Sequence, residues 1–536
     1  MDLIFTNGRI RTMDPGLPLA EALAVRFGRI QWVGSSHQAK ELSQSAKEVV
    51  DLGGRTVLPG FIDSHNHFCM TAFLRSQVDC RPAAGCLTSR DVVDALRQRA
   101  ENTPPGRWIL GWGYASYLLE DRRELTRRDL DLASTRHPIC LVHVSVHGAV
   151  VNSLALQKLG YSGRSPDPPG GRILRDSRGA PNGILQESAI MGPLFFASPS
   201  IYSRVMAEQS PQGRVQMMVD CAGDYNKLGI VAVHDPLVDP LTLRTFQEAE
   251  QAAGLTLRLR PYVLNQWVTP LLEAGILHGF GSEWLKIGAI KIFLDGGMSS
   301  RTAAVSRPYV GGGRGILNYD FKALLEEIRR LSQAGYRISV HAQGDRALGI
   351  LIKAFQRGTE AGNPLRHHLV HAGNITPPQI EKVSGLGLYI ASQANFFSLL
   401  GDGFIEAFGP RRSSGLYPFR TMLGKGIRLA LSSDSPVADP DPLVGVRDAV
   451  LRRTGSGREL GPQERLTVEE ALALYTREAA YFSQEEDLTG AVSPGKWADL
   501  VVLEQDPVSV AAEAIPSCRV RMTVVGGKVV YRDLGS

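Results

Sequence analysis

Apolar residues in the middle of the chain alternate between short runs and longer segments that have a helical period. One segment is apolar at positions 321, 324, 325, 328 and 331, which lie on one face of a helix. Another, over 467–482, starts with Thr467 and Glu470, a pair that predicts a capping box. Short apolar runs that predict strands lie at 57–63, 229–233, 257–263, 289–294, 338–341, 368–371, 388–392 and 428–432. Eight strand–helix units predict an α/β fold, a (β/α)8 TIM barrel of parallel strands.

Both ends of the chain have a different pattern, in which short strand-like runs are separated by turns. These runs lie at 3–5, 7–10, 22–26, 30–33, 48–51, 500–503, 520–525 and 528–531. Neither end has enough strands to bury a sheet alone. We therefore expect residues 1–57 and 488–536 to form one β-sandwich domain, with the barrel at 58–487. The alternative is two unrelated extensions at the edge of the barrel.

The gap between the first two barrel strands is longer than a crossover helix requires. Residues from about 80 to 220 are therefore expected to form an insertion at the mouth of the barrel. A helix over 91–101 and strands over 108–114 and 139–146 are predicted within it. The charged stretch over 120–131 is typical of a solvated face.

The amino-acid composition disfavours several classes of protein. The chain is 43% hydrophobic and 21% charged, with a net charge of +5 and no block of Lys and Arg, which favours a folded protein and disfavours nucleic acid as a partner. Six scattered cysteines without a Cys-x-x-Cys pair predict reduced thiols. No apolar run reaches about 18 residues and no secretory signal is recognised, so a cytoplasmic protein without membrane contact is expected.

Side chains that can bind a metal lie at the ends of the predicted strands. They are His65 and His67 after the first strand, His341 and His371 at the ends of the fifth and sixth, and Asp434 after the eighth. Two histidines two residues apart point to the same side of an extended strand. Imidazole and carboxylate suit zinc and similar ions, and the carboxyl ends of barrel strands form the catalytic face. Hydrogen-bonded structural histidines are the alternative.

Lys291 lies inside the apolar strand over 289–294, where a buried ammonium group is costly unless it is paired. A salt bridge to Asp295 is one explanation. The other is that the neutral amine takes up carbon dioxide and forms a carbamate, which could bridge two metal ions.

These motifs together resemble the amidohydrolase superfamily, and within it the branch of N-substituted formamide deformylases. The resemblance rests on residues 57–67, 111–114, 291–296, 300–303, 341–347, 371–372, 432–436 and 494–500, and so covers nearly the whole chain. It implies a distorted (β/α) barrel with a composite β-sandwich.

The resemblance also implies the metal ligands. His65, His67 and Asp434 would hold one divalent ion, His341 and His371 a second, and N6-carboxylated Lys291 would bridge the two. Zinc is the expected ion. A single ion beside an unmodified Lys291 remains open, because some members of the superfamily use one ion.

Two ions about 3.5 to 4 Å apart can hold a hydroxide and lower its pKa toward about 7. Asp434 would take the proton and pass it to the leaving nitrogen, and the second ion would polarise the substrate carbonyl. We therefore predict an enzyme in which a metal-bound hydroxide cleaves the C–N bond of a small N-substituted amide. A deaminase of a heterocyclic amine and a noncatalytic scaffold are the alternatives. Deaminases in the superfamily commonly have a glutamate after the fifth strand, where this chain has Gln343 and Asp345.

Other residues have weaker assignments. The resemblance places His147, which Asn152 follows, near the substrate carbonyl as a second catalytic residue. His143 is expected to be structural, and His234 and Asp235 could support the ligands. Glu187 recurs in the relatives, but its spacing gives no role. Aromatic residues expected to line the pocket, and to favour an apolar or aromatic substituent, are Phe68, Trp112, Tyr114, Phe396 and Phe397. A homo-oligomer, either a dimer or a tetramer, is expected from the superfamily.

Overall fold

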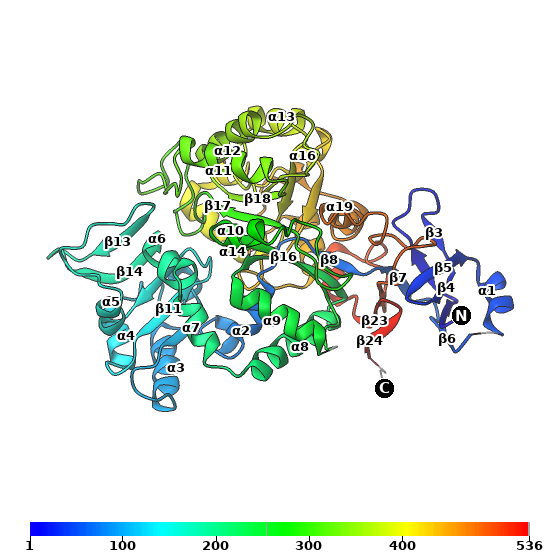
Figure 1. Ribbon diagram of the computed structural model, residues 1–536, viewed down its shortest axis with the longest axis horizontal. Helices are drawn as coiled ribbons and strands as arrows, with labels where there is room; N and C mark the ends of the chain where they lie inside the picture. Colours follow the sequence, from blue (N-terminus) through cyan, green and yellow to red (C-terminus); the bar gives the residue numbers. More distant parts are fainter. Residues whose placement is uncertain (45, 253, 534–536) are drawn as a thin grey trace.

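The computed structural model describes residues 1–44, 46–252 and 254–533, with an eight-stranded parallel sheet at the centre (Figure 1). Each strand pairs with the next strand of this sheet, in the order β21-β20-β19-β18-β17-β16-β15-β8. The strands are β8 (Phe61–Asp63), β15 (Ile230–Val238), β16 (Arg258–Leu264), β17 (Ala289–Phe293), β18 (Ile338–Ala342), β19 (His368–His371), β20 (Tyr389–Ser392) and β21 (Leu429–Leu431). The predicted (β/α)8 barrel is confirmed.

The barrel closes between its first and last strands through hydrogen bonds at their carboxyl ends. The Asp434 amide donates to the His65 carbonyl at 2.8 Å, and the His67 amide donates to the Ser435 carbonyl at 2.9 Å. Nearby, Ser64 Oγ donates to the Leu431 carbonyl at 3.0 Å. Among the described residues no strand ladder joins β21 to β8, so these contacts form the seam.

The long helices of the barrel units include α8 (Pro211–Lys227), α9 (Pro240–Gln251), α11 (Phe321–Gln333), α12 (Asp345–Gly358), α13 (Pro377–Gly385), α14 (Phe396–Phe408) and α17 (Pro442–Leu451). Helix α11 starts where the Asp320 side chain accepts a hydrogen bond from the Ala323 amide. Its apolar face buries Leu324, Ile328 and Leu331, as the sequence period predicts.

Two predicted elements are each divided in the structure. Residues 56–63 form β7 (Thr56–Pro59) and β8, which belong to different sheets. The break falls at Gly60, where an added Cβ would lie 2.3 Å from Val231 Cγ1. The helix expected over 467–482 is split into α18 (Val468–Leu474) and α19 (Arg477–Phe482), because Thr476 between them has φ −128° and ψ −94°.

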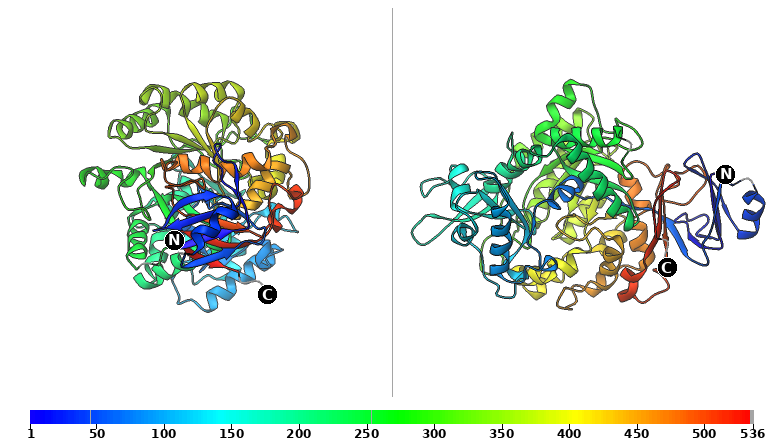
Figure 2. Two further views of the ribbon diagram at one scale, coloured as in Figure 1. Left: turned by 90° about the vertical axis from the view of Figure 1, so that its right-hand side faces the viewer. Right: turned by 90° about the horizontal axis from the view of Figure 1, so that it is seen from below.

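Strands from both ends of the chain lie together at one end of the molecule (Figure 2). One sheet has the order β24-β23-β22-β7-β2-β3, and the other has the order β5-β4-β1-β6. Buried apolar residues from both sheets, such as Phe5 and Val524, share one cluster. The bounds are β1 (Leu3–Thr6), β2 (Arg9–Arg11), β3 (Leu19–Ala20), β4 (Ala22–Arg26), β5 (Arg29–Gly34), β6 (Glu48–Asp51), β22 (Leu500–Leu503), β23 (Val520–Val525) and β24 (Lys528–Arg532). The division into domains stays a prediction.

The segment between the first two barrel strands forms a further six-stranded sheet, with the order β13-β14-β12-β11-β10-β9. It lies on the opposite side of the barrel from the terminal sheets (Figure 1). Its elements include β9 (Val78–Asp79), α3 (Ser89–Glu101), β10 (Ile109–Tyr114), α4 (Arg127–Ala133), β11 (Ile139–His143), β12 (Gly148–Val151), β13 (Gly171–Arg175) and β14 (Pro181–Glu187). The strand predicted over 139–146 therefore ends at His143, and a turn separates it from β12. No helix of the described segments is long and apolar enough to cross a membrane.

A buried ion pair ties barrel strand β16 to the terminal sheets. Arg258 Nε lies 2.7 Å from Asp499 Oδ2, and their side chains are 2% and 1% exposed. Asp499→Ala leaves the guanidinium unpaired, and we expect it to lower the free energy of unfolding by about 3–5 kcal/mol. Urea unfolding measures this change. Glu283→Ala, which removes the exposed partner of Arg29, is the control and should cost at most about 1 kcal/mol. Equal costs in the two variants would contradict the prediction.

Candidate functional site

The structure brings the six predicted ligands together at the carboxyl ends of the barrel strands, and none is more than 8% exposed. The four imidazole rings are neighbours in space. The distances between ring centroids are 5.4 Å from His67 to His65, 5.3 Å from His65 to His371 and 4.5 Å from His371 to His341. Asp434 Oδ1 lies 3.2 Å from Nε2 of both His65 and His67. Lys291 lies within β17, next to the strand that carries His341.

The spacing of these atoms fits a metal ion. Neighbouring donors around a tetrahedral ion with bonds of about 2.0–2.1 Å are about 3.3 Å apart. Both imidazole nitrogens have this separation from Asp434 Oδ1. Side-chain donors of His65, His371 and Asp434 also lie within 4.8 Å of one another. The cluster can therefore hold at least one divalent ion.

Lys291 lies against this cluster without a counter-ion. Its side chain is buried, and Nζ has no hydrogen-bond partner among the described residues. Nζ lies 4.7 Å from the centroid of the Phe293 ring. Asp295, the alternative partner, accepts hydrogen bonds from the amides of Ala304, Gln343 and Gly344. Burial lowers the pKa of Lys291 to about 7, although the charge of Asp434 opposes the change, so neutral amine is present near pH 7.

Burial also keeps the imidazoles neutral. It holds the pKa of His65 and of His341 well below the usual range, and it lowers the pKa of His371 to about 4. Burial alone would raise the pKa of Asp434, but hydrogen bonding to His65 and His67 outweighs it and holds that pKa well below the ordinary value. Neutral imidazole and ionised carboxylate are the forms that bind a metal.

A neighbouring side chain orients one of the candidate ligands, His371. Nδ1 of His371 lies 2.7 Å from Gln393 Oε1, a contact that leaves Nε2 of His371 free to bind a metal. His371 and Asp434 have φ angles of 70° and 60°, in the left-handed region that such side chains rarely adopt. Strained backbone of this kind is concentrated at functional sites.

His147 joins the cluster from the insertion. It lies in the turn between β11 and β12, beyond the end of the strand that carries His143. Its ring centroid is 4.8 Å from that of His341, and its Nδ1 is 3.1 Å from Glu187 Oε2. Glu187 ends β14, is 1% exposed and has a φ of 49°. No role for Glu187 could be predicted from the sequence, because the β12–β14 pairing that brings it to His147 is not visible in the spacing.

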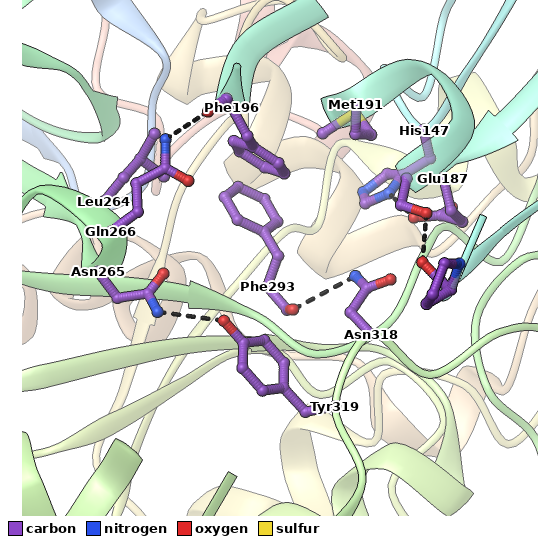
Figure 3. A pocket seen from close by; sticks show the side chains of 12 residues that line it. His147, Glu187, Met191, Phe196, Leu264, Asn265, Gln266, Phe293, Asn318 and Tyr319 are labelled. Carbon is purple, nitrogen blue, oxygen red and sulfur yellow. Dashed lines mark hydrogen bonds and ion pairs between the residues drawn. The ribbon is translucent and has the colours of Figure 1, made fainter. Parts of the chain in front are cut away.

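Beside the cluster lies a pocket of about 170 Å³ (Figure 3). The rings of Phe196 and Phe293 lie close together on one side of it, 5.6 Å apart, and His147 and Glu187 lie on the other. The remaining lining residues are Pro169, Ser188, Met191, Leu264, Asn265, Gln266, Asn318 and Tyr319. Phe293 is also 5.5 Å from the His341 ring, so the pocket adjoins the ligands.

None of the five aromatic residues expected at the pocket lines it: Tyr114 lines a second cavity that also touches His147, and the other four lie elsewhere around the site. Phe396 stacks on His371 at 6.2 Å, and Phe397 contacts Tyr417. Phe68 packs against Tyr225 and Phe246. Trp112 lies against the guanidinium of Arg81, and the Tyr114 hydroxyl donates to Glu124.

The pair expected to support the ligands is divided between two networks. The two ring nitrogens of His234 contact Tyr262 and Ser483. Asp235 accepts hydrogen bonds from the amides of Cys69 and Leu237.

Phe293 could have been found from the sequence, because it follows Lys291 by two residues and therefore shares its strand face.

Comparison with known proteins gives consistent matches over the whole chain. A model of the amidohydrolase family matches residues 48–531. The N-substituted formamide deformylase of Arthrobacter pascens is 31% identical over 553 residues, covering 100% of this chain and 99% of that protein. An uncharacterized metal-dependent hydrolase of Pyrococcus horikoshii OT3 has a TM-score of 0.76 at 26% identity, covering 95% of this chain and 99% of that one. A second such hydrolase, from Pyrococcus furiosus, has a TM-score of 0.71 at 26% identity and covers 95% and 100%.

Glu187 should control the protonation of His147. Burial lowers the pKa of this imidazole, but the charge and hydrogen bond of Glu187 outweigh burial and raise it. In Glu187→Gln we therefore expect the His147 pKa, followed by NMR titration of the metal-free protein, to fall. Because a raised folded-state pKa stabilises the fold below the unfolded value of about 6.5, the variant should lose more stability in acid than in base. An unchanged His147 pKa would contradict this assignment.

Proposed function

Because the chain belongs to the amidohydrolase family, it is a hydrolytic enzyme that acts on non-peptide C–N bonds, and we propose that its substrate is a small N-substituted amide. The observation that carries the proposal is the cluster of four imidazoles, Asp434 and an unpaired Lys291 beside a pocket that contains no Lys or Arg. The name of the Arthrobacter relative, a formamide deformylase, supports the same class of reaction.

The donor set supports a binuclear centre. We propose that His65, His67 and Asp434 hold one divalent ion and that His341 and His371 hold the other. Lys291 would contribute to both ions as a carbamate, since a buried amine with a pKa of about 7 is available to react with carbon dioxide and release one proton. Nitrogen and oxygen donors of this kind suit zinc. When bound, such ions supply an activated water and polarise the substrate carbonyl.

The protein's own residues then have separable roles. Asp434 is ionised and can accept a proton from the attacking water and deliver it to the leaving nitrogen. His147 lies beside His341 and, held by Glu187, can donate a hydrogen bond to the carbonyl oxygen as charge develops there. Phe196 and Phe293 form an apolar surface for a substituent on the nitrogen. The pocket favours an uncharged, ring-sized substituent.

Removal of the Lys291 amine tests the bridging role. We expect Lys291→Ala to lose at least about a thousandfold in kcat, the scale for removal of a group that acts in the transition state. The metal content, measured by elemental analysis, should fall from about two equivalents, and short carboxylic acids should restore part of the activity. Turnover at the level of the unmodified enzyme would refute the bridge.

The products distinguish the proposed reaction from deamination. Hydrolysis of an N-acylated aromatic amine should release one carboxylic acid for each amine, measured by liquid chromatography. Glu381→Gln, an exposed position outside the site, is the control and should release the same products at the same rate. Release of ammonia from a heterocyclic amine, with no acid from any amide, would favour the deaminase instead.

A further inference from the structure

Two cavities meet at His147. One is the pocket of about 170 Å³ described above, and the other is a groove of about 390 Å³. Of the residues that line them, His147 is common to both. An enzyme that divides an amide into two parts needs space for each part on either side of the reacting carbonyl, and His147 lies between two such spaces.

The groove has two unlike walls. One consists of insertion strands β12, β13 and β14, which contribute Val150, Leu174, Ile184 and Gln186. Burial along β14 alternates, with Ile184 and Gln186 half-buried and the residues between them buried, so these two side chains share the face of the strand that lines the groove.

The facing wall carries hydroxyl groups and paired charges. Tyr117, Ser299 and Ser300 provide hydroxyls. Glu406 on this wall lies 3.2 Å from Arg122, and Glu124 accepts hydrogen bonds from Tyr114 and Ser116. Arg301 also lines the groove, and its guanidinium donates to the carbonyls of Val310 and Glu406. The groove thus offers an apolar surface on one side and a polar wall with hydroxyl and charged groups on the other.

Hydrogen-bond acceptors indicate which part of the substrate lies in the pocket. Glu187 Oε1 and Asn318 Oδ1 are buried atoms without a hydrogen-bond partner among the described residues, and both residues line the pocket. A leaving nitrogen gains hydrogen and becomes a donor, which complements such acceptors. The amine part therefore fits the pocket, and the acyl part fits the groove on the other side of His147.

On the basis of the proposed amide hydrolysis, we propose that the groove is an acyl subsite and that the substrate carries an extended acyl chain. Its methylene groups contact the β12–β14 wall, and a hydrogen-bonding group on the acyl chain faces Tyr117 and Ser299. A formyl group has no substituent to place there. The protein therefore acts on amides whose acyl group is longer than formyl.

Chain length gives the first test. In a series of 4-nitroanilides from formyl to dodecanoyl, and in a second set from acetyl upward that carries a terminal hydroxyl, release of 4-nitroaniline gives kcat/KM. We expect kcat/KM to rise by about fourfold for each methylene group that is buried. This profile uses the unmodified enzyme and needs no variant. A maximum at formyl would refute the acyl subsite.

Two substitutions to Trp, at different positions along β14, test how far the acyl chain extends into the groove. Gln186 pairs with Gly148, next to His147, whereas Ile184 pairs with Val150 two residues farther along the strand. Two residues of strand span about 6.6 Å. Gln186→Trp should therefore block short acyl chains, and Ile184→Trp should block only chains longer by roughly five methylene groups. Gln186→Ala and Ile184→Ala, which remove side chains without filling the groove, are the matched controls and should show no new length limit.

The outcomes separate the two levels of proposal. A length limit that moves with the position of the Trp supports the subsite, because a general loss of stability would lower kcat/KM for all chains alike. Identical length profiles in both Trp variants would refute the subsite and leave amide hydrolysis intact. Failure to hydrolyse any anilide or other amide would refute the proposed function itself.

Discussion

The Asp63 carboxylate holds together the seam of the barrel, and the metal-ligand cluster depends on that seam. It accepts hydrogen bonds from the Ser433 amide at 3.0 Å and from Asn66 Nδ2 at 2.8 Å, and so joins the end of β8 to the segment after β21. His65 and His67 lie within four residues of Asp63, and Asp434 follows Ser433. Burial raises the pKa of Asp63 to about 6, so its ionised form at neutral pH costs stability that these donors offset. Two ligand-bearing segments, distant in sequence, thereby approach within contact distance.

Burial then prepares the donors of this cluster for a cation. It removes protons from His65, His341 and His371 and weakens the hold of Lys291 on its proton. Asp434 remains ionised. A cation in the cluster would therefore not have to displace protons from the imidazoles. The same low polarity that makes an unpaired Lys291 costly strengthens each interaction with a bound ion.

The sequence predicted the barrel because the hydrophobic pattern reports which faces are buried. It also predicted that the candidate ligands lie together, since residues at the carboxyl ends of parallel strands must converge whatever the loops do. Two predicted elements were divided for reasons that the apolar pattern does not contain. At Gly60 the cause is the close approach of Val231, and at Thr476 it is the local backbone conformation.

The pocket was harder to predict than the ligands. Its walls come from Phe196, Asn265 and Asn318, which lie on separate connections of the insertion and the barrel. Their meeting depends on how these loops pack, which a single sequence does not specify. Aromatic type alone was a poor guide, since Phe68 and Phe397 pack among other buried rings. Lys291 was informative because, unlike an aromatic residue, a charged residue within an apolar strand is rarely part of an ordinary core.

The insertion contributes to the chemistry only through contacts that form when it docks on the barrel. Its sheet has a buried cluster of its own, which includes Val92, Leu125 and Leu141. Glu187 lies at the end of β14 and His147 directly before β12, and their pair reaches the candidate ligands through the contact of His147 with His341. Changes on the outer strands can therefore reshape both cavities while the seam and the ligands stay fixed. The barrel thus carries the groups that perform the reaction, whereas the insertion contributes the walls that select the substrate.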